Sequence, residues 1–435
     1  MQKHPLSVAK TMVVGLGFLG INLVWPVFNS FVPLFLQAGN PQFEQQLIAA
    51  GRELPAVIGF GLSPSLAFFI MTWDNIFNVV VSPWAGMQSD QRWTRFGRRK
   101  PWMMIGVPIA ALALSFIPMA NSLLAIMVFI IITNFGMALF RSPTVAWLGD
   151  LFTKENRSKA NGIINLMGGI GGAISLFGSG FLFDRFGRTA PFLGTALLLV
   201  LVEGIAIWQV KEPKHIETEN QQLHHQQFFK NMRTLLKNQS RSSMLMFLSI
   251  FFYFMAYEAL QTGLTSFGVF NLGISPGLAA SMTTIFAGAF IMFAVPSGIL
   301  ATKLGRKRTM IIGLVSMVLL FSFGFFFIQS PLVLGIVLLL TGVSWSFVNV
   351  NSLPLVFDLG DENQLGLYTG LYYVAAQSAA VAGPVLSGIV VETFQNNYRW
   401  LWAVSGLYVL LGLSTIMMVH PEDKNSIRIN TNHDH

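Results

Sequence analysis

Cysteine is absent from this sequence of 435 residues, and charged residues are scarce. Without cysteine the chain can form neither a disulfide nor a thiolate metal site, and it has no thiol nucleophile. Charged residues make up 11% of the chain, less than half of the roughly 25% that is typical of a soluble domain. Hydrophobic residues make up 53%. These proportions argue against a water-soluble globular protein and favour one that lies in a lipid bilayer.

The sequence also lacks the features of an enzyme or a receptor. None of the seven histidines lies inside a long apolar segment, and no long polar domain is present. We therefore expect no metal site, no cofactor and no enzymatic site, and a sensor or scaffold is disfavoured. The net charge of +8 does not indicate nucleic acid binding, because the basic residues lie mainly in short loops between apolar runs.

Twelve apolar runs of 19 to 28 residues divide the sequence. A helix of about 20 apolar residues crosses the hydrocarbon core of a bilayer and satisfies its own backbone hydrogen bonds there. The runs are therefore predicted to be transmembrane helices. They cover residues 12–36, 65–89, 102–120, 123–149, 161–183, 190–210, 243–270, 277–301, 309–328, 331–357, 365–391 and 398–419.

The loops between the runs predict the orientation. If both termini are cytoplasmic, 22 of the 27 lysine and arginine residues fall on the cytoplasmic side and 4 on the outer side, while Arg141 lies within a run. Such an excess is typical of the cytoplasmic face of membrane proteins. We expect a multi-pass protein of the cell membrane with both termini in the cytoplasm.

One long polar segment, residues 211–242, divides the runs into six plus six. We predict an N-terminal six-helix bundle over 1–210, a cytoplasmic linker over 211–242, and a C-terminal six-helix bundle with a cytoplasmic tail over 243–435. A motif shared by residues 86–100 and 298–308 supports this division, because it follows the second run of each half. The predicted fold is an all-α membrane protein with twelve transmembrane helices in two pseudo-symmetric six-helix bundles.

The first copy of that motif, GMQSDQRWTRFGRRK at 86–100, resembles the signature loop of the major facilitator superfamily. Its spacing, and the stretches at 141–152, 344–354 and 367–384, are similar to plant sucrose transporters, their animal relatives and the glycoside–pentoside–hexuronide cation symporters. The resemblance implies a secondary transporter with a cytoplasmic charge network that gates movement between the halves. On this chain the gating residues would be Asp90, Arg98, Arg99, Asp150 and Arg157.

One departure from the resemblance bears on the coupling ion. Sodium-coupled members of that branch carry paired aspartates on the second helix, whereas the matching positions here are Asn78 and Ser82. The difference argues against a sodium site. Proton coupling is therefore favoured, and sodium coupling remains an alternative.

Three ionisable residues lie deep inside the predicted helices: Asp74, Arg141 and Glu258. At 1.5 Å per residue, Asp74 lies about 24 Å from Asp90 at the inner edge of the membrane. Charged groups are costly at such depth and commonly mark ion or proton pathways. We predict that these three residues couple transport to proton binding, with a fixed structural ion pair between Asp74 and Arg141 as the alternative. Glu203 in the sixth run is a weaker candidate.

Amide and aromatic side chains recur at helical spacing on the first, second, tenth and eleventh runs. A sugar site needs flat apolar surfaces together with fixed hydrogen-bonding groups. The alternative for each aromatic residue is core packing or a place at the membrane interface. The candidate substrate-binding residues are Asn22, Trp25, Asn29, Asn78, Trp345, Asn349, Tyr372, Tyr373 and Gln377.

The combined prediction is secondary active uptake of a sugar by proton symport, with a glucoside disaccharide such as sucrose or maltose as the substrate. The expected partners are the sugar, the proton and the lipid bilayer, and the protein is expected to act as a monomer. Transport of another small organic solute, including export, is the main alternative.

Overall fold

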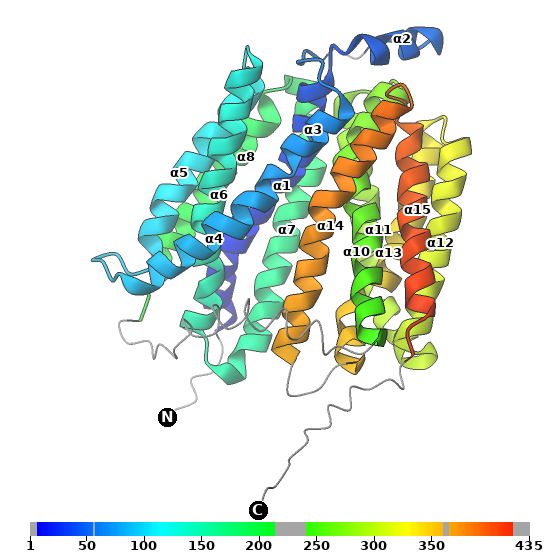
Figure 1. Ribbon diagram of the computed structural model, residues 1–435. Helices are drawn as coiled ribbons and strands as arrows, with labels where there is room; N and C mark the ends of the chain where they lie inside the picture. Colours follow the sequence, from blue (N-terminus) through cyan, green and yellow to red (C-terminus); the bar gives the residue numbers. More distant parts are fainter. Residues whose placement is uncertain (1–6, 55–56, 214–240, 360–364, 421–435) are drawn as a thin grey trace, which may run out of the picture.

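The computed structural model describes residues 7–54, 57–213, 241–359 and 365–420, which form helices without a β-strand (Figure 1). Within those ranges, twelve helical segments are long and apolar enough to cross a bilayer, which confirms the predicted spans. Most of the predicted linker and tail, at 214–240 and 421–435, lies outside the described residues.

The elements follow the predicted order in both halves. In the first half they are α1 (Val8–Gln37), α2 (Pro41–Ala49), α3 (Pro64–Met71), α4 (Trp73–Gln91), α5 (Lys100–Phe116) with the 3-10 turn η1 (Ile117–Met119), α6 (Leu123–Leu151), α7 (Lys154–Phe186) and α8 (Ala190–Gln209). In the second half they are α10 (Arg241–Ser266) with the π-helical turn η2 (Phe267–Asn271), α11 (Pro276–Leu304), α12 (Arg306–Phe327), α13 (Pro331–Leu359), α14 (Leu365–Thr393) and α15 (Arg399–Met417).

The second predicted run is interrupted at Thr72, where α3 ends and α4 begins. The Thr72 hydroxyl donates to the carbonyl oxygen of Phe69 (2.8 Å), a local bond that competes with the helical hydrogen-bond pattern. This break was not predicted, because the apolar run continues through Thr72 without interruption. It places Asp74 in the first turn of α4 instead of inside a continuous helix.

Both halves use the same pairs of neighbouring helices. In the first half α1 packs against α7 and α8, α5 packs against α6 and α8, and α4 packs against α6. In the second half α10 packs against α14 and α15, α12 packs against α13 and α15, and α11 packs against α13. Each pair in one half is the counterpart of a pair in the other, as expected for a pseudo-symmetric fold.

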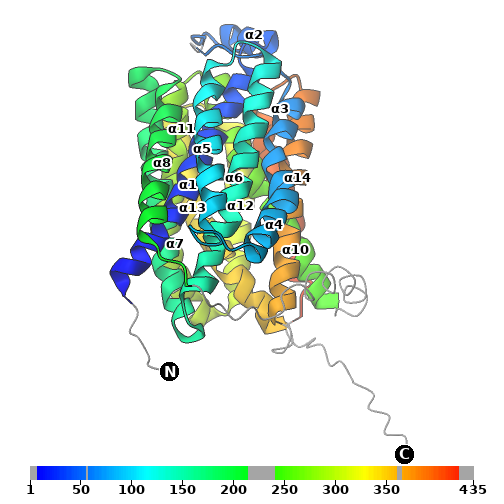
Figure 2. The same cartoon turned by 90° about the vertical axis from the view of Figure 1, so that its left-hand side faces the viewer.

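The halves contact each other mainly through α3 with α14 and α7 with α11. A Cβ atom on Gly388 of α14 would lie 2.8 Å from the carbonyl oxygen of Pro64, so α3 and α14 approach closely. From there α4 and α14 diverge toward the end that carries the chain termini (Figure 1). Helix α2 lies at the opposite end in both views, and we call this the α2 end (Figures 1 and 2).

The short helix α2 was not predicted, because it lies outside the apolar runs. Helix α2 forms hydrogen bonds with the turn between α14 and α15, where Gln395 and Asn396 adopt positive φ angles of 59°. Gln46 Nε2 donates to the carbonyl oxygen of Gln395 (2.5 Å), and Asn396 Nδ2 donates to Gln42 Oε1 (2.5 Å). The helix thus ties the first half to the second at the α2 end.

Candidate functional site

Asp74 lies near two other ionisable side chains, one in each half. Asp74 lies on α4, Arg141 on α6 and Glu258 on α10. The Asp74 carboxylate accepts hydrogen bonds from Asn75 N (2.7 Å) and Asn75 Nδ2 (2.9 Å). Asp74 is close enough to interact electrostatically with Arg141 of its own half and with Glu258 of the other half. The structure therefore brings the predicted charged trio together.

Within the described residues, these charges interact without direct contact. Asp74 and Arg141 form no ion pair within 4.0 Å, and neither the Arg141 guanidinium nor the Glu258 carboxyl forms a hydrogen bond there. All three side chains are half-buried. The fixed ion pair, which was the alternative interpretation of Asp74 and Arg141, is not formed in this conformation.

Polar side chains also lie on α4 and α14, near the middle of the membrane spans. Ser82 Oγ donates to Asn78 Oδ1 (3.4 Å) and to the carbonyl oxygen of Ala138 on α6 (3.2 Å). On α14, Tyr373 and Gln377 are exposed. An amide that faced lipid would have no hydrogen-bond partner. We therefore assign this face of α14 to the space between the halves.

The side chains of the predicted residues on α1, and of Asn349 on α13, are also partly accessible. Asn22 is exposed and donates from Nδ2 to the carbonyl oxygen of Phe18 (2.8 Å). Trp25, Asn29 and, on α13, Asn349 are half-buried. Each of them therefore presents atoms that a solute could contact.

Trp345 and Tyr372 lie in a buried aromatic cluster of the second half. Trp345 is 2% exposed and stacks on Tyr257, with the ring centroids 4.5 Å apart and the planes inclined by 4°. Phe254 meets both Trp345 and Tyr372 edge-on. Because both side chains pack in the core here, their role in stacking on a sugar stays a prediction.

Buried polar residues join the halves at the α2 end. Gln37 Nε2 of α1 donates to Ser266 Oγ of α10 (3.3 Å), and the Tyr398 hydroxyl donates to Gln37 Oε1. Burial raises the pKa of Tyr398, so its hydroxyl remains a neutral donor at physiological pH. Nearby, Ser65 of α3 donates to Glu392 of α14. We call these residues, together with the α7–α11 contact described next, the seal.

The α7–α11 contact depends on an aspartate and two glycines. Asp184 of α7 accepts hydrogen bonds from Ser275 Oγ (2.8 Å) and Gly277 N (3.0 Å) at the N-terminus of α11, where the helix dipole favours a negative charge. A Cβ atom on Gly277 would overlap the Asp184 carboxyl, and one on Gly180 would overlap the carbonyl oxygen of Gly277. Sequence reasoning had not identified Asp184.

Four of the five predicted gating residues form one charge cluster. Arg98 Nη2 lies 2.5 Å from Asp150 Oδ1, and Arg99 Nε lies 2.8 Å from Asp150 Oδ2. Asp90 pairs with Arg99 and lies 3.9 Å from Arg98. Arg157 instead donates to two carbonyl oxygens at the end of α6. Within the described residues all these contacts lie in the first half, so the cluster does not bridge the halves in this conformation.

Sequence reasoning missed Glu212, which follows α8 and holds this loop in place. Its carboxylate accepts hydrogen bonds from the backbone nitrogens of Arg98 (2.6 Å), Arg99 (3.1 Å) and Lys100 (3.0 Å). It also accepts one from Trp147 Nε1 of α6 (3.0 Å). A carboxylate at this point satisfies the free amides at the start of α5 and interacts favourably with the helix dipole.

Glu212→Ala is expected to lower the thermal stability of the protein. A lost helix cap costs about 1 kcal/mol, and each hydrogen bond to a charged group contributes about 1.5–3 kcal/mol. The unfolding temperature of the purified protein in detergent measures the effect. Glu53→Ala, which removes an exposed carboxylate with no hydrogen bond among the described residues, is the control. Equal unfolding temperatures for the two variants would contradict the anchoring role of Glu212.

The second copy of the motif forms a simpler contact. Arg306 pairs with Asp358, and the two side chains are 43% and 48% exposed. Thr302, at the position equivalent to Asp90, donates to the carbonyl oxygen of Ile299 (2.7 Å). The charge cluster is therefore stronger in the first half.

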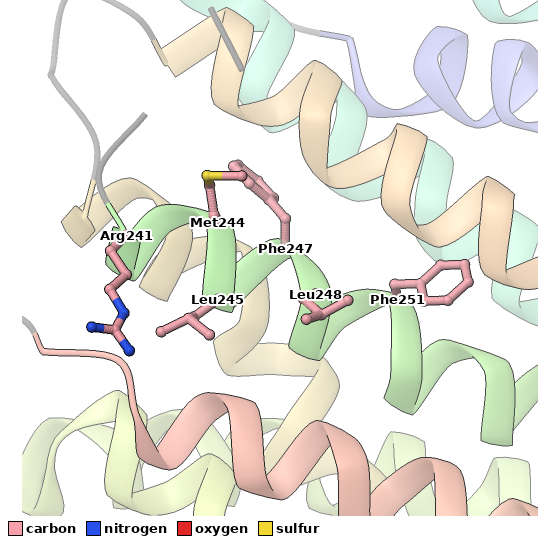
Figure 3. A pocket seen from close by; sticks show the side chains of 6 residues that line it. All are labelled: Arg241, Met244, Leu245, Phe247, Leu248 and Phe251. Carbon is pink, nitrogen blue, oxygen red and sulfur yellow. The ribbon is translucent and has the colours of Figure 1, made fainter. Parts of the chain in front are cut away.

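A groove of about 680 Å³ lies at the start of α10 (Figure 3). Glu258 is 17 residues further along the chain from Arg241, or about 25 Å along the helix axis. The groove is therefore not assigned to the substrate. Its described lining consists of Arg241, Met244, Leu245, Phe247, Leu248 and Phe251.

Comparisons with known proteins agree with this architecture. The family model of the Major Facilitator Superfamily matches residues 11–272 and 246–433. Multidrug resistance protein 2 of Bacillus subtilis (strain 168) is 26% identical over 415 residues, which cover 94% of this chain and 93% of that protein. A mutant of the nucleoside transporter NupG has a TM-score of 0.71 at 15% identity, over 93% of this chain and 99% of its own. For a D-xylose-proton symporter the TM-score is 0.64 at 16% identity, over 95% and 98% of the two chains. At these identities the solved structures indicate a shared fold only.

Proposed function

Because the chain belongs to the Major Facilitator Superfamily and is a membrane transporter, we propose that it carries a sugar together with a proton. The observation that supports this proposal best is the trio of Asp74, Arg141 and Glu258, whose charges interact across the halves without a direct ion pair. In the proposed mechanism Asp74 binds the proton, and Arg141 favours its ionised form when the proton has left. Glu258 supplies a second acid from the other half.

The proposed substrate site lies between the halves, near this trio. Amides on α1, α4, α13 and α14 would bind hydroxyl groups, while Trp25 and Tyr373 would offer aromatic surface. A sugar presents both kinds of surface, since its rings have apolar faces and its edges carry hydroxyls. A glucoside disaccharide remains the favoured substrate.

On the proposed orientation, we assign the structure to a state that is open to the cytoplasm. The excess of basic residues favours a cytoplasmic location for the end that carries the termini. The seal at the α2 end would then close the outside, and the divergence of α4 from α14 would open the inside. The charge cluster at Asp90 and Arg99 would gate the change to the opposite state.

A second candidate function is the export of an amphipathic organic solute in exchange for protons. The sequence similarity to Multidrug resistance protein 2, which is 26% identical over 415 residues, favours this export function. The aromatic cluster around Trp345 could accommodate such a solute if the second half repacks during transport. The charged trio would couple protons to this activity as well.

Purified protein in lipid vesicles distinguishes these functions. A proton symporter accumulates labelled sucrose or maltose when the outside is more acidic than the lumen, whereas a proton-coupled exporter moves a lipophilic organic solute and leaves sugars unmoved. An imposed sodium gradient at equal pH is the control and should drive no accumulation. The sugar assignment fails if no sugar in a panel of labelled disaccharides and monosaccharides accumulates. Sodium-driven accumulation would instead remove the proton assignment.

A further inference from the structure

Glu203 on α8 is a buried acid for which the proposed mechanism has no use. The side chain has no exposed surface, and neither carboxyl oxygen has a hydrogen-bond partner in the described structure. Buried carboxyl groups are almost always paired or hydrogen-bonded, because desolvation of an unpaired charge costs several kcal/mol. An acid without a partner at this depth therefore needs an explanation.

The carboxyl group points into a notch on α1. A Cβ atom on Gly20 would lie 2.5 Å from Glu203 Oε1, and one on Gly17 would lie 3.6 Å from Oε2. Thr144 of α6 closes the notch, because its methyl group would overlap a Cβ atom on Gly17. The absence of side chains at two positions of α1 thus makes the room that the carboxyl occupies.

No described charge compensates an ionised Glu203. Helix α8 packs against α1, α5 and α7, and the notch also includes α6. No described charged side chain on these helices forms an ion pair or hydrogen bond with Glu203. The neutral acid is therefore the form that fits this packing. The described charged side chains on α1, α5, α6 and α7 are Lys10, Lys100, Arg141, Asp150, Arg157, Lys159, Asp184 and Arg185.

We propose that Glu203 is a second proton-binding site, located behind α1 and separate from Asp74 and Glu258, and that it holds a proton whenever α1 packs against α8 as it does here. When the proton leaves, the carboxyl O–H bond breaks, water accepts the proton, and the resulting charge forces α1 away from α8. The proposal is independent of the substrate, so it stands or falls separately from the sugar assignment.

The position of the notch links this proton to the substrate site. At 100° per residue, Gly17 and Gly20 lie about 140° around α1 from the face that carries Asn22, Trp25 and Asn29. A displacement of α1 from α8 would therefore move the candidate substrate-binding residues on its opposite face. Binding of the proton and of the solute would then be thermodynamically coupled.

Infrared spectroscopy of the full chain in lipid vesicles tests whether the proton is there. The background is the double variant Asp74→Asn/Glu258→Gln, in which the two acids of the proposed mechanism can contribute no carboxyl band. The carbonyl stretch of a protonated carboxylic acid in a dry environment is expected in this background, and it should be lost when Glu203→Gln is added. Retention of the band in the triple variant, when its other bands match the double variant, would overturn the proposal. Glu203→Leu, which is also uncharged, serves as a second variant if the glutamine variant does not assemble.

Spin labels test the movement of α1. Because the chain has no cysteine, the pair Met12→Cys on α1 and Trp208→Cys on α8 introduces the only two thiols. Raising the pH should lengthen the distance between the labels when Glu203 is present and leave it unchanged in Glu203→Gln and Glu203→Leu. The same lengthening in all three backgrounds would overturn the link between this proton and the packing of α1.

Discussion

Asp74→Asn is expected to abolish accumulation driven by a pH gradient while sugar-for-sugar exchange continues. Asparagine keeps a carbonyl oxygen that can accept the two hydrogen bonds from Asn75, so the start of α4 is preserved. It cannot bind or release a proton. One pH unit is worth 1.36 kcal/mol, so a transporter that moves one proton per solute accumulates its solute about tenfold per unit. The variant should only equalise the concentrations on the two sides, as measured by uptake of labelled sugar into vesicles.

Two further variants assign this effect to Asp74. Glu44→Gln changes an exposed acid of α2 to its amide and should accumulate sugar like the wild type. Glu258→Gln tests the acid from the other half. If Glu258→Gln loses accumulation but keeps exchange, while Asp74→Asn accumulates normally, the main proton site lies in the second half. Loss of both accumulation and exchange in Asp74→Asn would indicate a structural role instead.

The features that could be predicted from the sequence depend on local periodicity or on a contiguous motif. Apolar run length predicted the twelve spans, and a spacing of four residues placed Asn78 and Ser82 on one face, where they now share a hydrogen bond. The pairing of Asp90 with Arg99 could be predicted because both belong to one contiguous motif. Helix rise placed Asp74 and Arg141 inside the membrane at depths that differ by about 10 Å, and it did not reveal whether the two side chains make direct contact.

The features that sequence reasoning missed arise between distant segments. Glu212 contacts backbone amides more than 110 positions earlier in the chain, and the partners of Asp184 lie more than 90 positions later. Nothing in the residues around either acid identifies these partners. Trp345 illustrates a related difficulty, since the pattern of α13 does not reveal whether an aromatic ring faces a cavity or the stacked ring of Tyr257.

Gly180→Val is expected to open the seal and to stop transport. The valine side chain would overlap the carbonyl oxygen of Gly277 and the hydroxyl of Ser281, and a backbone oxygen cannot rotate out of the way. Overpacking of this kind costs about 1–3 kcal/mol, and the cost applies only to the state in which α7 lies against α11. That penalty shifts the equilibrium toward the opposite state by a factor of about 5 to 150. Gly178→Val is a matched control, because a Cβ atom there meets nothing within 4 Å.

A single cysteine reports the state of the seal in both variants. Ser266 is buried in the seal next to Gln37, and Ser266→Cys adds one thiol to a chain that has none. A membrane-impermeant maleimide applied from the α2 side should label this thiol several times faster in Gly180→Val than in Gly178→Val, and transport should be lost in Gly180→Val alone. Equally slow labelling of both variants would mean that the close approach of α7 to α11 does not hold the seal closed. The buried hydrogen bonds of Gln37 with Ser266 and Tyr398 would then have to account for the closure.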